Sequence, residues 1–188
     1  MNSPEVYFHD NHDLISNICH NTQEIFKIKD VDQPSPICLP VHRVLYHDVL
    51  LPKGASLEFQ KYQFLWEAVL NFKDKEDPPY KALHLIIPLS REAPLIGNVA
   101  FCKRIADIHY ISQGVAVQVD LHREDECDRC LHAHFLVSPY TFSGNGSRLE
   151  KWIDVSQDME EESFHFYSSN PVQKTERDVR YGGVKMIE

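Results

Sequence analysis

The sequence predicts an α+β fold in which helices pack on one face of a mostly antiparallel sheet. Strand-length apolar runs alternate with two long stretches whose apolar residues recur with helical spacing. Two more strand-like segments then follow one another across a short polar, acidic connection, as the strands of a hairpin do. The order strand, helix, strand, helix, strand, strand is typical of a sheet with its helices segregated to one face.

The first half of the chain supplies two strands and at least one helix. Residues 42–51 carry β-favouring side chains and run into the turn Pro52-Lys53-Gly54. Residues 56–72 have a broad apolar face, which predicts a helix. Residues 81–89 are almost continuously apolar, which predicts a strand buried on both faces. An imperfect apolar stripe in residues 11–26 allows an earlier helix, whereas Val6-Tyr7-Phe8 gives only a weak signal for an N-terminal strand.

The second half continues the alternation. Residues 94–110 are predicted as a helix, and Gly114 follows shortly after its end. Residues 115–122 and 131–138 are predicted as the two strands of the hairpin. A short helix is predicted at residues 148–153, before an acidic run.

The composition excludes several classes of protein. Hydrophobic residues make up 43% and charged residues 25% of the chain, the balance of a soluble globular domain. No stretch approaches the roughly 20 apolar residues of a membrane span. The polar, acidic N-terminus does not look like a secretory signal, so we expect a cytoplasmic protein. Five cysteines, an odd number, argue against a disulfide framework.

The net charge of −9 counts against a large nucleic-acid footprint, because phosphate contacts need Lys and Arg. A local basic patch or a bound cation can still act within an acidic chain. The eleven histidines are more than we expect for this length, and their positions carry more information than their number.

Three of these histidines are predicted to converge. Side chains alternate across a strand, so His132 and His134 project from the same face, about 7 Å apart. His122 ends the preceding strand, and a hairpin would bring it beside that pair. Imidazole is a good ligand for divalent metals, and three protein ligands leave positions open for a substrate. The pattern therefore predicts a metal site made by His122, His132 and His134.

Two other interpretations of this stretch stay open. Cys127 and Cys130 precede His132 and His134, so these four side chains could instead form a structural zinc site, although such sites usually combine two distant ligand pairs. Alternatively, the cysteines are free thiols in the loop and the two histidines of the strand are an ordinary surface pair.

Several segments between residues 43 and 142 together form a wider pattern: a strand ending in Leu50-Leu51-Pro52-Lys53-Gly54-Ala55, a helix with Tyr62, Leu65 and Trp66, the strand Ala82-Leu83-His84-Leu85-Ile86-Ile87-Pro88, a helix ending in Cys102-Lys103-Arg104-Ile105-Ala106, Gly114 before the strand that closes on His122, and the strand Leu131-His132-Ala133-His134-Phe135-Leu136-Val137. With this pattern, the chain resembles the N-terminal catalytic domain of the MobA/MobL mobilisation relaxases, a branch of the HUH endonucleases. The resemblance divides the chain into a divergent N-terminal segment (1–42), a relaxase-like core (43–142) and an acidic C-terminal segment (143–188).

The resemblance implies a function. Such relaxases nick and rejoin single-stranded DNA at a plasmid transfer origin, together with other mobilisation or conjugation proteins. A divalent metal (Mn, Mg or Zn) held by histidines polarises the scissile phosphate, and a tyrosine forms a 5′-phosphotyrosyl link. By this resemblance His122, His132 and His134 are the metal ligands. Asp120 and Asp125 are candidates to orient them, although an ordinary solvated position is the simpler interpretation of each.

The nucleophile is where the sequence departs from the family. The expected stretch contains no tyrosine, and Cys19 or His20 falls nearest the expected position. Tyr7 is the candidate catalytic residue and Tyr46 is a second candidate, whereas loss of the nucleophile is the explanation that the sequence favours. Two other functions therefore remain open. The chain could be a catalytically inactive, relaxase-like DNA-binding or accessory protein that keeps the fold and metal site, or it could hydrolyse its substrate with metal-activated water.

Overall fold

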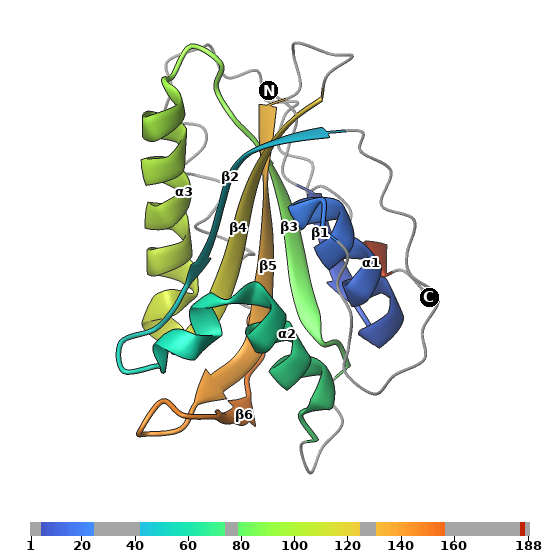
Figure 1. Ribbon diagram of the computed structural model, residues 1–188, viewed down its shortest axis with the longest axis vertical. Coiled ribbons are helices and arrows are strands. Elements are labelled where there is room, and N and C mark those ends of the chain that lie inside the picture. Colours follow the sequence, from blue (N-terminus) through green and yellow to red (C-terminus); the bar gives the residue numbers. More distant parts are fainter. Residues whose placement is uncertain (1–4, 25–41, 74–78, 125–130, 157–184, 187–188) are drawn as a thin grey trace, which may run out of the picture.

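A computed structural model describes residues 5–24, 42–73, 79–124, 131–156 and 185–186 of the chain. Its centre is a sheet with the strand order β2-β4-β5-β3-β1-β7, and β6 pairs with β5 beside this path (Figure 1). The strands are β1 (Glu5–His9), β2 (His42–Leu50), β3 (Ala82–Pro88), β4 (Val115–Glu124), β5 (Leu131–Phe142), β6 (Leu149–Trp152) and β7 (Lys185–Met186).

Antiparallel pairing dominates the sheet. Every neighbouring pair is antiparallel except β1 and β7, which run parallel. The predicted hairpin is formed by β4 and β5, which lie in the middle of the sheet with β3 and β2 on either side. This confirms the predicted α+β fold with a mostly antiparallel sheet.

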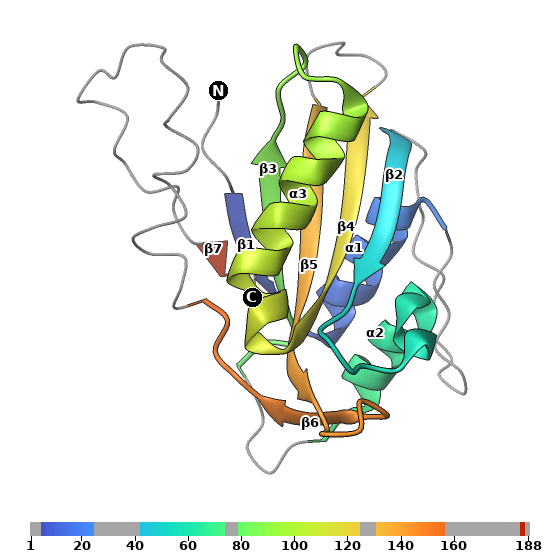
Figure 2. The same ribbon diagram turned by 90° about the vertical axis from the view of Figure 1, so that its left-hand side faces the viewer.

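The helices cover both faces of the sheet, which differs from the prediction of one face. Helices α1 (Asn11–Thr22) and α2 (Tyr62–Asn71) pack on one side, and α3 (Leu95–His109) packs on the other (Figure 2). The reason lies in the strands themselves. The first four residues of β3 are all buried, and β5 is buried along most of its length. Strands that bury side chains on both faces of a sheet need cover on both.

Two predicted helices differ in detail. The helix expected over residues 56–72 starts as the short 3-10 helix η1 (Leu57–Gln60) and restarts as α2 after Lys61, whose backbone is extended. The helix expected at residues 148–153 is wrong, because this segment contains β6. A turn closed by the hydrogen bond from the Ser143 amide to the Arg148 carbonyl, 2.9 Å long, returns the chain beside β5. A window of six residues is too short for its periodicity to separate a helix from a strand.

The N-terminal segment contributes to the same sheet as the rest of the chain. The weakly predicted strand is present as β1, which pairs along its whole length with β3. Helix α1 buries Leu14, Ile15 and Ile18 against the sheet. A second 3-10 helix, η2 (Ile111–Gln113), leads from α3 to Gly114, whose φ of 88° lets the chain turn sharply into β4. Within the described residues, no helix is long and apolar enough to span a membrane.

Candidate metal centre

Five histidines from four strands form a cluster on one face of the sheet, beneath α1 and α2. The strand register sets this arrangement, because residues opposite one another in neighbouring strands share a face. Asp120 lies opposite His134, and His122 lies opposite His132. Tyr7 lies opposite His84, which joins the same face from β3. A sixth histidine approaches from α1 above. The six are His9, His20, His84, His122, His132 and His134.

The tightest group comprises His20, His122 and His134. Each offers one ring nitrogen, and the three nitrogens lie within 4.8 Å of one another. His122 and His134 are buried, and His20 is partly exposed. His132 stands beside them, with its ring centroid 4.8 Å from that of His134 and 5.7 Å from that of His122. The structure thus gathers the three predicted ligands and adds His20 to them.

Helix α1 orients His122. The Nε2 of this ring lies 2.6 Å from the backbone carbonyl oxygen of Asn21. A carbonyl can only accept, so Nε2 carries the proton of the neutral ring. The lone pair is then on Nδ1, the atom left to bind a metal. A carbonyl partner of this kind commonly fixes the tautomer and orientation of a metal-binding histidine.

A row of hydrogen-bonded imidazoles orients His134. Nε2 of His9 lies 2.9 Å from Nδ1 of His84, and Nε2 of His84 lies 2.8 Å from Nδ1 of His134. This leaves Nε2 of His134, which is buried and has no hydrogen-bond partner among the described residues. A buried polar atom without a partner costs about 1–3 kcal/mol, a cost that a metal bound to this nitrogen would remove.

The electrostatics of the row keep its rings neutral. Burial lowers the pKa of His84 and of His134 well below the ordinary value, and the neighbouring histidines lower both further. Burial also lowers the pKa of His9, against the opposing effect of Asp13 and Asp10. Neutral imidazole is the form that binds metals. The donor set therefore fits a borderline divalent ion such as Zn²⁺ better than Mg²⁺, which prefers oxygen ligands.

Tyr7, the candidate nucleophile, lies at the outer end of this row. Its ring centroid is 5.9 Å from that of His84 and 6.4 Å from that of His9, and its hydroxyl donates to Glu5. This hydrogen bond is the main cause of a raised Tyr7 pKa, followed by burial. Tyr7 shares the histidine face, but its contacts are with the far members of the row rather than with His134.

Tyr46, the second candidate, lies on the opposite face of the sheet. It packs against the core beneath α3, and the Lys103 ammonium lies 5.6 Å from the centroid of its ring. Its hydroxyl donates to Asp48 at 2.6 Å. Tyr46 is therefore separated from the histidines by the sheet itself.

Asp120, predicted as an orienting residue, has partners other than the metal cluster. Its fully buried carboxylate lies 2.5 Å from Nδ1 of His47 and accepts a 2.6 Å hydrogen bond from Gln118, whose carbonyl oxygen accepts from Trp66 at 2.5 Å. The bond to Asp120 raises the pKa of His47. Burial raises the pKa of Asp120, and His47 opposes this shift. The other candidates at this end (Asp125, Cys127 and Cys130) lie outside the described residues.

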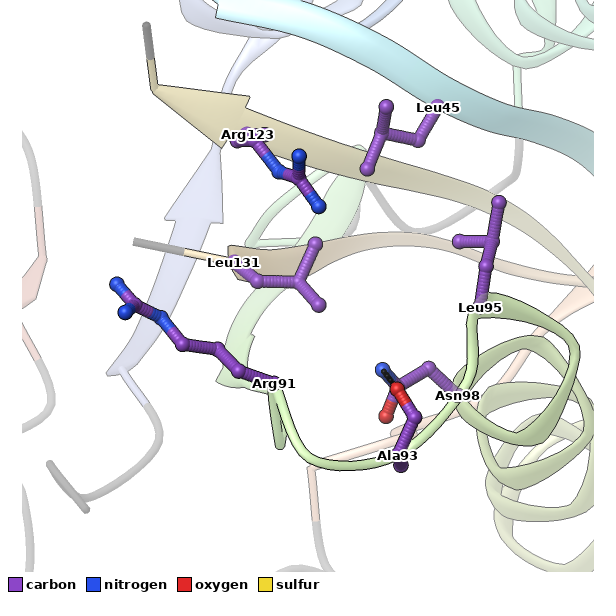
Figure 3. Close-up of a pocket in the computed structure, with 7 residues that line it drawn as sticks. All are labelled: Leu45, Arg91, Ala93, Leu95, Asn98, Arg123 and Leu131. Atoms are coloured by element: carbon purple, nitrogen blue, oxygen red, sulfur yellow. Dashed lines mark hydrogen bonds between the residues drawn. The ribbon is translucent and has the colours of Figure 1, made fainter. Parts of the chain in front are cut away.

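The other face of the sheet carries a separate pocket. A hollow of about 400 Å³ lies near the start of α3 and is lined by Leu45, Arg91, Ala93, Leu95, Asn98, Arg123 and Leu131 (Figure 3). Arg123 follows His122 and Leu131 precedes His132, and alternation along the strands sends these neighbours to opposite faces. The pocket is therefore not continuous with the histidine cluster.

Comparison with known proteins identifies the family of this chain. The model of the MobA/MobL family matches residues 41–180, well over half of the chain. The chain belongs to the MobA/MobL family. Family membership confirms the resemblance seen in the sequence and supports a mobilisation relaxase in general, a class whose partner is single-stranded DNA.

One solved structure has a similar fold. The structure described as "Molecular Basis of Vancomycin Resistance Transfer in Staphylococcus aureus" is similar with a TM-score of 0.64 and 21% sequence identity, over 80% of this chain and 76% of that one. At this identity the likeness shows the fold alone. No curated protein matches the chain.

Sequence reasoning did not place His20 in the cluster, and the structure does. It lies about a hundred residues from the paired strands, so no local spacing connects it to them. The one available signal was that His20 stands near the position where a MobA/MobL chain is expected to carry its nucleophile.

Proposed function

We propose that this MobA/MobL chain is a metal-dependent relaxase that nicks and rejoins single-stranded DNA at a transfer origin. The observation that supports metal dependence most directly is the buried Nε2 of His134, which has no hydrogen-bond partner among the described residues, in a ring that offers a nitrogen within 4.8 Å of nitrogens of His20 and His122. His122, His132 and His134 are the ligands expected from the sequence. A divalent metal held there would supply a Lewis acid for the scissile phosphate.

The nucleophile in this proposal is Tyr7. Its hydroxyl oxygen forms a bond to phosphorus while the bond from phosphorus to the 3′ oxygen breaks. The products are a 5′-phosphotyrosyl link and a 3′ oxygen that takes up a proton from water. Glu5 already accepts a hydrogen bond from the Tyr7 hydroxyl, so its carboxylate is placed to receive the proton that Tyr7 loses. Rejoining reverses these steps.

A second candidate function is a non-catalytic DNA-binding or accessory protein that keeps the fold and the metal site. The position of Tyr7 favours it, because this side chain contacts His9 and His84 and not the group around His134. The net charge of −9 is in line with weak binding to DNA. In either role we expect the protein to act in the cytoplasm beside other mobilisation proteins.

A covalent-adduct assay separates the two functions. The protein is incubated with Mn²⁺ and labelled single-stranded oligonucleotides that cover candidate transfer origins, and adducts are resolved on a denaturing gel. The relaxase function predicts an adduct that disappears with Tyr7→Phe and with His134→Ala. Tyr46→Phe is the matched control, because Tyr46 lies across the sheet, and it should keep the adduct.

The remaining outcomes are equally informative. An adduct that survives Tyr7→Phe but not His134→Ala keeps the metal site and moves the nucleophile to another residue. If neither adduct nor cleavage forms, while a relaxase of established activity succeeds in the same assay, the accessory function replaces the enzymatic one.

A further inference from the structure

Building on the proposed metal-dependent function, we infer that His20 is a metal ligand together with His122 and His134, so that the bound metal links α1 to the sheet. The sequence pattern predicts three ligands that all lie on the β-hairpin. The structure instead brings one donor from a helix and two from the central strands, β4 and β5, into one group.

The distances suit one shared ion. The three ligand nitrogens lie within 4.8 Å of one another. Two imidazole nitrogens bound tetrahedrally to one zinc ion at about 2.0–2.1 Å are roughly 3.4 Å apart. Any two of the three nitrogens thus need to approach by at most about 1.4 Å, and the partly exposed His20 side chain has room to adjust its rotamer. Its ring centroid lies at nearly equal distances from those of His122 (5.9 Å) and His134 (5.8 Å), so it faces the gap between them.

The backbone of His20 is fixed over this gap by folding alone. The preceding residue, Cys19, is fully buried in the core beneath α1. The following residue, Asn21, accepts the hydrogen bond from His122 through its carbonyl oxygen. His20 is therefore held between a packing contact and a hydrogen bond to another ligand, which leaves its side chain directed at the cluster.

The hydrogen bonds of His122 and His134 each use one ring nitrogen and leave the other for a metal, which supports this ligand set. His134 uses Nδ1 toward His84, and its buried Nε2 has no hydrogen-bond partner among the described residues. His122 uses Nε2 toward Asn21, which leaves Nδ1 for the metal. A metal on Nε2 of His134 requires the proton of that ring on Nδ1, so His134 donates to His84 and His84 in turn donates to His9.

Cobalt spectroscopy tests whether position 20 lies in the coordination shell. A thiolate bound to Co²⁺ gives a strong near-ultraviolet charge-transfer band that imidazole ligands do not give. We expect the His20→Cys variant loaded with Co²⁺ to show this band above the wild-type spectrum, which already includes the five native cysteines. The His132→Cys variant loaded with Co²⁺ tests in the same way whether position 132, a ligand expected from the sequence, is bound to the metal. Absence of the band in His20→Cys overturns the inference, whatever His132→Cys shows.

Metal affinity gives a second readout that does not need a cysteine. His20→Ala should weaken Zn²⁺ binding by about 100-fold or more in a competition with a chelating dye, since loss of an outer-sphere partner alone costs 10–100-fold. His109→Ala, on α3 at the opposite face, is the control and should leave the affinity unchanged. Zinc should also slow hydrogen exchange of the α1 amides in the wild type and not in His20→Ala.

These measurements separate the ligand assignment from the enzymatic proposal. If His20→Ala binds zinc as tightly as the wild type, the inference fails even if the protein nicks DNA. If His20→Ala loses zinc while the wild type forms no DNA adduct, the ligand assignment stands and the enzymatic function falls. Circular dichroism of the metal-free variant checks its fold, and the His20→Cys spectrum remains decisive if the alanine variant is unstable.

Discussion

The two faces of the sheet are built from the same strands but serve different purposes. On the face beneath α3, the strands contribute an apolar core that contains Leu85, Val119, Leu121, Ala133 and Phe135. On the face beneath α1 and α2, the same strands contribute the histidine row, together with Gln118, Asp120 and an apolar patch around Leu136 and Tyr140. Consecutive residues of one strand thus alternate between the apolar core beneath α3 and the polar face with the histidines.

This difference shows how a small domain can hold a buried polar site. On the polar face, His9, His84, His122 and His134 are each hydrogen-bonded to another ring or to the α1 backbone. The α3 face supplies apolar burial without such requirements. We therefore expect substitutions on the two faces to separate the free energy of unfolding from metal affinity.

Phe135→Ala should have the largest effect on stability. Phe135 is fully buried in the core beneath α3, and truncating such a residue costs about 3–5 kcal/mol of the free energy of unfolding. Chemical denaturation of the metal-free protein measures this loss. Zinc affinity of the folded fraction should stay within a few-fold of the wild type. A large drop in affinity without a loss of stability would show that the two faces are not separable.

His134→Ala, one residue away, should give the converse result. We expect zinc affinity to fall by about 100-fold or more, because a ligand is lost together with the partner of His84. The free energy of unfolding of the metal-free protein should fall by less than in Phe135→Ala, since the variant also removes a buried nitrogen without a partner. Equal zinc affinity in His134→Ala and the wild type would exclude this cluster as the metal centre.

Much of the fold could be predicted from the sequence because local patterns specify it. The apolar run that became β3 and the amphipathic stretch that became α3 each carry their own periodicity. The segment that became β6 does not, since its pairing with the end of β5 is a tertiary contact. The covering of both faces also follows from tertiary packing, although the continuous burial expected for residues 81–89 already implied it.

The candidate site divides in the same way. His122, His132 and His134 could be predicted to lie together because a hairpin and strand alternation fix their relation. His20, His9 and His84 could not, because each joins the cluster through contacts between distant segments. Asp120 was only a candidate to orient the metal ligands. The β2 register brings His47 opposite it, and the carboxylate is hydrogen-bonded to that ring instead.

The smallest predicted effect on the free energy of unfolding concerns the pair His47–Asp120. It tests whether this pair, on the same face as the histidine cluster, is independent of the metal centre. Its hydrogen bond raises the pKa of His47, so the protonated ring is favoured in the folded protein. This contribution is fully present below the ordinary histidine pKa of about 6.5 and is lost as the pH rises through the raised pKa of the folded state. With the His47 side chain 33% exposed, we expect about 1 kcal/mol.

Denaturation of the wild type and of His47→Gln across this pH range measures the effect. The difference between their free energies of unfolding should shrink from acidic to alkaline pH, while zinc affinity at neutral pH stays within a few-fold. A constant difference would mean that His47 is neutral throughout and that the pair is an ordinary hydrogen bond. A matching loss of zinc affinity would mean that Asp120, opposite His134 in the sheet, couples the pair to the metal centre after all.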